Sequence, residues 1–359
     1  MKYIYIDNIA RFFFFKNLLK LDLKKNNLFF LCDLPSVYFF LKKQNLKNIQ
    51  LITDNKYKSF ISKLITINFV KIYNLVPADF ILLWNGKVKI QDKLVKLNKF
   101  KNKLFIENIN LNNMFQFGNS GVNSFHETIN FSNQKKNKYK GLELDPKIII
   151  LLNKAHPSNP NNNKLFGREK FKRSIKYLFI DIIFEPKIII DTVFIFLYEN
   201  LNKLAQRIFF LLKKLRLKRK SSKVKECILL QVHNDINYLE NSIISYKELI
   251  NKLNKKTNSD IYIKPRPQDF NFAFLLKIFH PFKIKFDYSS STELLSEKGY
   301  KYFHTINSSY GACLAGNNSM AKVFFYGVSP LIGKNALKFT KNYLKSKEEL
   351  SSIVRSYIE

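Results

Sequence analysis

Several residue types and motifs are scarce in this sequence, and each absence narrows the possibilities. Cysteine occurs only as Cys32, Cys227 and Cys313, far apart and in apolar surroundings, so we expect no disulfide framework, no cysteine metal site and a reducing compartment. Arginine is scarce beside lysine, which disfavours recognition of nucleic-acid base edges. The chain has no Walker sequence, no dinucleotide glycine fingerprint and no Asp-x-Asp pair for a metal, so neither a cofactor nor a metal is expected.

Acidic residues are also scarce. The chain has 61 Lys and Arg against 27 Asp and Glu, a formal net charge of +34. Such an excess favours an anionic partner, which is nucleic acid, an acidic lipid surface or a phosphorylated substrate. An AT-rich coding genome equally explains the abundance of Lys, Asn, Ile and Phe. Because no basic region carries the glycine–aromatic pattern of an RNA-binding sheet, we expect no nucleic-acid partner.

The sequence lacks a signal peptide and an uninterrupted membrane span. The aromatic N-terminal run is broken by Asp7, Arg11 and Lys16, and no small-residue cleavage site follows it. The very apolar segment 178–198 contains four charged side chains that are costly at the centre of a bilayer: Asp181, Glu185, Lys187 and Asp191. We therefore expect a cytoplasmic chain in which this segment is a soluble element.

Short apolar runs alternate with stretches of helical spacing in two parts of the chain. In the first part, strands are expected at 28–32, 48–53, 78–84 and 103–107. From Cys227 the alternation resumes, with a helix capped by Asn241 or Ser242. Strands joined by helices form βαβ units and mostly parallel sheets. The predicted fold class is α/β, with two Rossmann-like domains facing a cleft.

The predicted domain boundaries follow changes in composition. An N-terminal domain with a helical extension covers 1–210 and a second domain covers 226–335, with helices at 336–359 that cross back. Between the domains lies 211–225, which carries eight basic residues. This segment is either a solvated linker or a patch that docks on an anionic membrane surface, where each cation contributes about 1 kcal/mol.

Polar side chains follow three expected strands of the second domain. The stretch from Gln231 to Asp235 follows the first strand, Lys264 and Arg266 follow the second, and Ser308 and Ser309 precede a short helix after the third. Hydroxyls and N–H groups at a helix N-terminus suit a phosphate, which nearby cations neutralise. Asp235 then acts as a nucleophile or general base.

Each of these residues also has a plain structural interpretation. Ser308 and Ser309 are typical helix caps, and Asp235 is typical of a turn that bonds its own backbone. The Lys-Pro-Arg-Pro run resembles an exposed basic loop. Only convergence of the three strand ends favours a ligand site.

Several ordered motifs resemble the bacterial capsule polysaccharide synthesis family. The second half carries "ILLQVHNDINYLENS", "IYIKPRPQD" and "HTINSSYGACLAGNN", similar to the family's Gln-x-x-x-Asp, Lys-x-His-Pro and Ser-Ser-x-Gly segments. The first half carries "LLWNG" and "LFIENINLNNMFQFGNSGVNS", similar to its Trp-Asn-Gly and Phe-Ile-Glu segments. The resemblance covers roughly 78–127 and 227–330.

The resemblance implies a glycosyltransferase of the GT-B type that retains anomeric configuration. The implied donor is CMP-activated 3-deoxy-manno-octulosonic acid (Kdo), and the implied acceptor is a lipid or glycan. The resemblance places the acceptor beside the domain 1–210 and makes 226–335 the nucleotide-sugar-binding domain. By position, Asp235 and Glu107 are the catalytic carboxylates. The implied donor-binding residues are Gln231, Lys264, Arg266, Ser308 and Ser309. The residues implied to face the cleft on the acceptor side are Asn85, Gly86 and Asn123.

One residue departs from the family pattern. The family's histidine in Lys-x-His-Pro is Arg266 here, which can bind a phosphate or carboxylate but cannot shuttle a proton near neutral pH. This favours an alternative in which the chain is inactive and serves binding or export coupling. In the active interpretation, the chain works with capsule assembly or export machinery, peripheral to the inner membrane.

Overall fold

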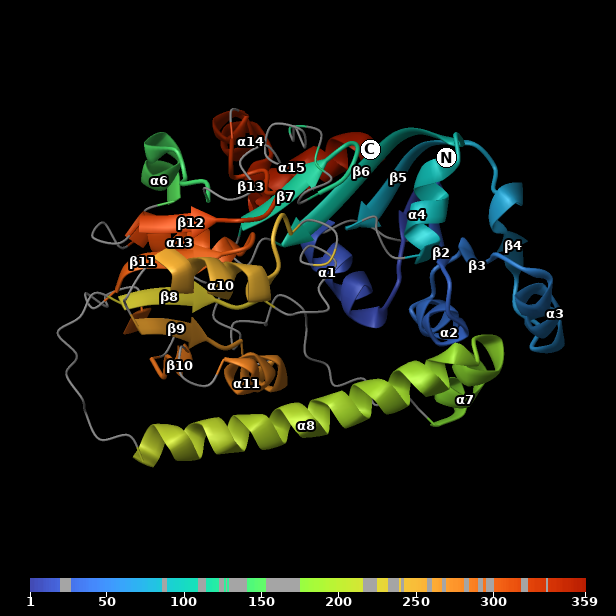
Figure 1. Ribbon diagram of the computed structural model, residues 1–359. Coiled ribbons are helices and arrows are strands. Elements are labelled where there is room, and N and C mark those ends of the chain that lie inside the picture. The colour runs from blue at the N-terminus through green and yellow to red at the C-terminus, as the bar shows by residue number, and fades with distance from the viewer. Residues whose placement is uncertain are drawn as a thin grey trace.

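The computed structural model describes most of the chain. The described residues are 1–19, 27–85, 89–108, 114–122, 126, 128, 141–152, 175–215, 225–231, 239, 242–256, 260–266, 269–280, 284–289, 293–294, 300–317, 322–333 and 335–359. They form two α/β domains, each built on its own sheet, beneath which a long helix runs (Figure 1).

The first domain is built on an eight-stranded sheet. Its strands are β1 (Lys2–Tyr5), β2 (Leu28–Cys32), β3 (Ile49–Thr53), β4 (Phe69–Lys71), β5 (Ala78–Trp84), β6 (Phe100–Asn108), β7 (Met114–Gly118) and β13 (Leu344–Ser346). Their order is β13-β7-β6-β5-β1-β2-β3-β4, and only the β6–β7 and β7–β13 pairs are antiparallel. The central strands are buried on both sides, as their nearly continuous apolar sequences require.

Helices cover both faces of this first sheet. They are α1 (Ile9–Leu19), α2 (Pro35–Lys43), α3 (Lys56–Leu64), α4 (Lys89–Lys96) and α15 (Lys347–Ile358), with a short 3-10 turn η1 (Ile72–Asn74). α15 comes from the C-terminal end of the chain, yet Leu350, Val354 and Ile358 are fully buried in the first domain's core. The end of the chain therefore stabilises the domain in which the chain begins.

The second domain contains a five-stranded parallel sheet. Its strands are β8 (Lys225–Leu229), β9 (Asp260–Lys264), β10 (Ile284–Phe286), β11 (Tyr300–Thr305) and β12 (Lys322–Phe325), in the order β10-β9-β8-β11-β12. Its helices are α6 (Pro146–Leu152), α10 (Tyr246–Lys256), α11 (Phe270–Phe279), α13 (Ser309–Asn317) and α14 (Ala336–Asn342). Separate apolar clusters fill the two faces, one containing α6, α13 and α14, the other α10 and α11.

The structure confirms the predicted α/β fold class with two Rossmann-like domains. One local prediction was wrong. Ser242 does not cap α10, because it forms an isolated bridge with Gly327 and the helix begins four residues later. Ser245 caps it instead: the Ser245 hydroxyl accepts from the Glu248 N–H at 3.2 Å, and the Glu248 carboxylate accepts from the Ser245 N–H at 2.7 Å. Asn241 lies outside the described residues.

Two helices connect the domains. α7 (Ile175–Phe184) packs against α2 and α3 of the first domain, and α8 (Lys187–Leu215) packs against α11 of the second. Pro186 separates α7 from α8, since proline cannot continue the hydrogen-bond ladder of a helix. In Figure 1, α8 is the long helix along the bottom of the molecule, running beneath both domains.

Both sheets have a point where the strand order reverses. In the first sheet this point lies between β1 and β5, and in the second between β8 and β11. Ligands of open α/β sheets bind outside the carboxyl ends of the strands at such points. The arrows of β5 and β6 and those of β8 and β9 point towards the centre of the molecule (Figure 1). The carboxyl ends of the two sheets therefore face one another.

Candidate functional site

Two strand ends of the second domain are joined by a reciprocal hydrogen bond at its reversal point. Gln231 follows β8, and its Nε2 donates to Asn307 Oδ1 at 2.6 Å. The Asn307 backbone N–H, which follows β11, donates to Gln231 Oε1 at 2.9 Å. Gln231 is buried, and its own N–H donates to the Tyr246 hydroxyl at 2.8 Å. Gln231 therefore holds the turn after β11 at a defined position beside β8.

Lys264 ends β9 on the other side of β8. Its Nζ lies 3.7 Å from Asp287 Oδ1, and both side chains are largely buried. Burial lowers the pKa of Lys264, and the neighbouring Asp287 carboxylate acts in the opposite direction. Asp287 also accepts hydrogen bonds from the Tyr300 hydroxyl and, at 2.9 Å, from the Ser289 N–H. Lys264 is thus a fixed cation.

Ser308 is the cap of α13. Its Oγ accepts from the Tyr310 N–H at 3.2 Å, and its own N–H donates to Thr305 Oγ1 at 3.3 Å. The plain interpretation of Ser308 as a helix cap is therefore confirmed. A capping hydroxyl still has a hydrogen to donate, so this role does not prevent Ser308 from contacting a ligand. Ser309 is the first residue of α13, and its side chain lies outside the described residues.

Gly311 lets the first turn of α13 lie close to the end of β11. A Cβ at this position would lie 2.8 Å from Thr305 Cγ2, closer than packed carbon atoms approach. Because α13 follows directly from the β11 end, its N-terminus, the positive end of the helix dipole, lies at the reversal point beside Gln231.

The order β9-β8-β11 thus gathers four of the predicted residues around one edge of the sheet. Lys264 ends β9 and Arg266 follows it, whereas Ser308 follows β11. Gln231 follows β8, the strand between β9 and β11. Arg266 is half-buried. Cations on one side and a helix N-terminus on the other can bind a phosphate between them.

Asn85 and Glu107 lie together at the carboxyl edge of the first sheet. Asn85 follows β5 and Glu107 lies near the end of β6, and Asn85 Nδ2 donates to Glu107 Oε1 at 3.2 Å. Asn85 has a φ of 62°, in the left-handed region that asparagine tolerates better than most residues. This conformation turns the chain sharply at the strand end.

Asp7 and Arg11, which we did not predict as site residues, lie near this pair. Asp7 follows β1, and its Oδ1 lies 3.8 Å from Arg11 Nε. The Arg11 guanidinium lies over the Trp84 ring, 3.8 Å from its centroid. Burial lowers the pKa of Arg11, whereas the charges of Asp7 and Glu107 raise it. The polar end of the run "YIYID" is the sequence signal for this cluster.

Three predicted residues lie outside the described part of the chain: Asp235, Gly86 and Asn123. The catalytic role of Asp235 therefore stays a prediction. Among the described residues, no group of three or more His, Cys, Asp and Glu side chains is arranged to hold a metal ion.

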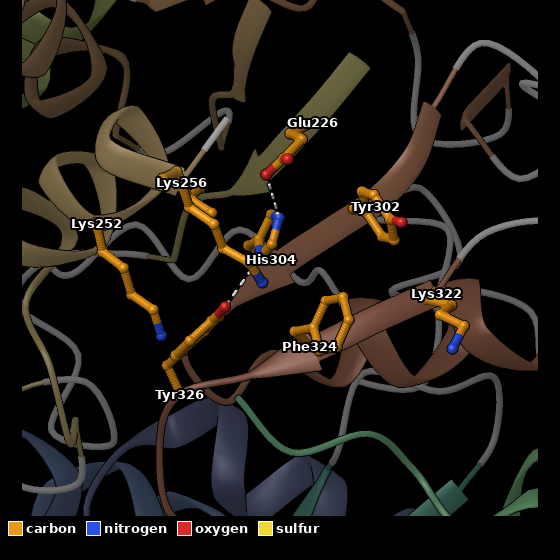
Figure 2. A pocket seen from close by; sticks show the side chains of 9 residues that line it. Glu226, Lys252, Lys256, Tyr302, His304, Lys322, Phe324 and Tyr326 are labelled. Atoms are coloured by element: carbon orange, nitrogen blue, oxygen red, sulfur yellow. Dashed lines mark hydrogen bonds and ion pairs between the residues drawn. The ribbon is translucent and has the colours of Figure 1, made fainter. Parts of the chain in front are cut away.

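A separate pocket of about 350 Å³ lies on the α10 face of the second sheet (Figure 2). Its charged lining residues are Glu226, Lys252, Lys256 and Lys322, and its aromatic ones are Tyr302, His304, Phe324 and Tyr326. One of its lining residues, Glu226, lies near the start of β8, whereas the predicted site residues lie at or after the strand ends. No sequence motif indicated this pocket.

His304 is the buried centre of this pocket. Its Nε2 lies 2.9 Å from Glu226 Oε2, and its Nδ1 lies 3.2 Å from the Tyr326 hydroxyl (Figure 2). Burial lowers the pKa of His304, although Glu226 raises it. The geometry fits a neutral imidazole that donates to Glu226 and accepts from Tyr326. His304, to which we assigned no function from the sequence, is thus a hydrogen-bonded core residue.

Comparisons with known proteins give limited information. No protein-family model matches the chain, and no curated protein sequence matches it significantly. One similar solved structure is Thermosulfurimonas dismutans KpsC, beta Kdo 2,7 transferase, with 12% identity, coverage of 99% of each chain and a TM-score of 0.44. Another is KpsC, beta Kdo 2,4 transferase, from the same organism, with 10% identity, coverage of 77% of this chain and 79% of that chain, and a TM-score of 0.32. At these levels of similarity neither structure identifies an activity.

Proposed function

We propose that this chain is a glycosyltransferase of capsule or surface-glycan assembly. It transfers an acidic sugar, Kdo, from its CMP-activated form to a lipid or glycan acceptor. The donor binds at the carboxyl edge of the second sheet, and the acceptor binds beside the first. The motifs that resemble the capsule family support the choice of substrate.

One observation carries the proposal. The Gln231 and Asn307 side chains are hydrogen-bonded across the reversal point of the second sheet, with Lys264 ending the next strand. Residues separated by 76 positions in the chain are therefore brought together where α/β sheets bind ligands. A nucleotide phosphate fits this edge because the α13 N-terminus and the Lys264 and Arg266 cations favour negative charge.

In the proposed reaction, an acceptor hydroxyl forms a bond to the anomeric carbon of the sugar. The bond between that carbon and the CMP phosphate oxygen breaks, and the electron pair leaves with CMP. Asp235 either stabilises the positive charge that develops at the anomeric carbon, or attacks that carbon to displace CMP and is itself displaced by the acceptor hydroxyl in a second step. Glu107 receives the acceptor proton. Lys264 and Arg266 stabilise the charge that develops on the departing phosphate.

Glu107 is suited to its role by two neighbours. Asn85 donates a hydrogen bond to its carboxylate at 3.2 Å, which orients the side chain. The Arg11 charge interacts favourably with Glu107 in its ionised form, the form that accepts a proton. Asn85 and Arg11 are therefore proposed as positioning residues.

The presence of Arg266 in place of the family's histidine supports a second candidate, a protein that binds the nucleotide but does not transfer sugar. An arginine holds a phosphate well and cannot exchange a proton near neutral pH. This candidate predicts CMP binding without product.

The two candidates are separated by one experiment. The purified full chain is incubated with CMP-Kdo and either phosphatidylglycerol or a short glycan, and mass spectrometry tests for an acceptor that gains one Kdo. We expect product from the wild type, none from Asp235→Asn, and a hundredfold or greater loss with Glu107→Gln. CMP binding measured by calorimetry should survive in both variants. Wild-type product formation by Asp235→Asn would refute its role, and CMP binding without any product would favour the second candidate.

A further inference from the structure

Helices α7 and α8 expose many large apolar side chains to solvent. Most of these residues have at least about two fifths of their surface exposed. On α8 they are Ile189, Ile190, Val193, Phe194, Phe196, Leu197, Leu201, Leu204, Ile208, Phe210, Leu211 and Leu212, and on α7 they are Phe179 and Ile183. Monomeric proteins rarely expose a contiguous apolar surface of this kind, so this one marks an interaction site.

Other side chains of these helices anchor them to both domains. Asp181 on α7 is buried and accepts a hydrogen bond from the Ser36 N–H at 2.9 Å. Asn202 on α8 is also buried, and its Oδ1 accepts from the Phe270 N–H at 2.5 Å. Phe209 packs in the core of the second domain. Because these contacts set the rotation of both helices, the outer apolar side chains face away from the two cores.

Helical spacing arranges most of the exposed α8 side chains in one stripe. Successive positions in this stripe are three or four residues apart, which is the spacing of one helix face. The positions are 190, 193 or 194, 197, 201, 204, 208 and 211 or 212. At 1.5 Å per residue the stripe is about 30 Å long. The helix that carries this stripe, α8, runs along the bottom of the molecule beneath both domains (Figure 1).

Positive charge accompanies the stripe. By the same spacing, the exposed Arg207 lies beside the stripe. The exposed Lys203 lies one turn before Arg207 on the polar side of the helix, next to Glu199. In the sequence, the end of α8 leads into 211–225, which has eight basic residues and no acidic one. An apolar stripe with flanking cations is typical of helices that lie in the interface of an anionic bilayer.

We propose that the outer face of α7 and α8 binds the surface of an anionic lipid bilayer. α8 lies parallel to the membrane, with its apolar stripe in the boundary between head groups and acyl chains and its cations against lipid phosphates. Within the described residues, no helix is long and apolar enough to cross a bilayer, which is consistent with attachment along the surface. This proposal does not depend on the transfer reaction.

Vesicle binding of the full chain tests the proposal. We expect tight binding to vesicles of equal parts phosphatidylglycerol and phosphatidylcholine, and at least tenfold weaker binding to phosphatidylcholine alone. Leu197→Ser with Leu204→Ser should weaken binding more than tenfold, since each leucine loses its burial among acyl chains. Lys203→Gln with Arg207→Gln should weaken binding about fivefold per charge on anionic vesicles only. The matched control is Ile150→Ser, because Ile150 is 68% exposed on α6, on the far side of the molecule from α8 (Figure 1).

Two outcomes would overturn the proposal. One is vesicle binding that is absent or unchanged by the leucine substitutions, which would mean that another part of the chain covers this face or that another surface binds lipid. The other is a wild-type dimer in sedimentation without vesicles that Leu197→Ser with Leu204→Ser converts to a monomer, since the face would then bind a second copy. Neither outcome bears on sugar transfer to a soluble glycan, which is measured separately.

Discussion

Gly311 offers a direct test of how the turn after β11 is built. In Gly311→Ala, the new Cβ would lie 2.8 Å from Thr305 Cγ2. Thr305 is fully buried, and its Oγ1 accepts from the Ser308 N–H at 3.3 Å. Rotating the Thr305 side chain away would therefore break a hydrogen bond that fixes the site turn. The structure thus predicts both a loss of stability and a displacement of Ser308.

The expected magnitude follows from opposing effects. Overpacking of this kind costs about 1 to 3 kcal/mol in the free energy of unfolding. Alanine gains about 1 kcal/mol over glycine in a helix, so the net loss should be about 0 to 2 kcal/mol. Thr305→Ser removes the clashing methyl, keeps the hydroxyl and alone costs about 1 kcal/mol. In the double variant the methyl at 311 fills the space left at 305, so its stability should return close to wild type.

The assay uses two probes because the chain has two domains. Hydrogen exchange of the α13 amides reports the second domain. Fluorescence of Trp84, the single tryptophan, reports unfolding of the first domain in urea and should not change. Stability losses that simply add in the double variant, or a shift in the Trp84 transition, would refute this account of the turn.

Further predictions concern other buried contacts. Gln231→Leu should cost about 2 kcal/mol, because two hydrogen bonds to Asn307 are lost and leave polar groups partly buried; a cycle with Asn307→Ala should show coupling, and a coupling near zero would contradict the proposed link. Burial lowers the pKa of His304, so as pH falls the unfolded chain takes up the proton first. The contribution of neutral His304 to stability should be complete above the ordinary pKa of about 6.5 and should fall as pH drops below it. In urea unfolding, His304→Gln should flatten this pH dependence. Burial raises the pKa of Asp33 from 3.8 to about 7, so its contribution to the free energy of unfolding should be greatest at low pH and should decline as pH rises from about 4 to 7. Asp33→Asn should remove that decline. An unchanged pH dependence of stability would count against a protonated Asp33.

The α/β class and most of its elements were predictable from sequence. Apolar runs such as 78–84 are typical of strands buried on both faces, and the stretches between them have helical spacing. The polar residues after β8, β9 and β11 could also be identified as a possible site, because parallel strands end at one edge of a sheet. The central strand β1 and the antiparallel β7 and β13 were not predicted, since strands of four, five and three residues have weak local patterns.

The tertiary structure alone decided which strand ends are neighbours. Gln231 contacts Asn307 because β11 crosses over to lie beside β8, while β9 and β10 lie on the other side. Local sequence patterns contain no information about this order. Likewise, Arg11 lies over Trp84 because β1 lies next to β5, although these two strands are far apart in the sequence.

The outer face of α8 also separates what the sequence indicates from what the tertiary structure decides. From the sequence, the charges within 178–198 argued for a soluble element, and the structure uses Asp181 and Glu185 to fix α7 on the first domain. Only packing could show which apolar side chains of α8 enter the core and which remain exposed, because both sets have helical spacing. The sequence by itself determined the elements and their chemistry, through local periodicity. The tertiary structure decided which residues meet and which apolar face stays open, because those outcomes depend on contacts between distant parts of the chain.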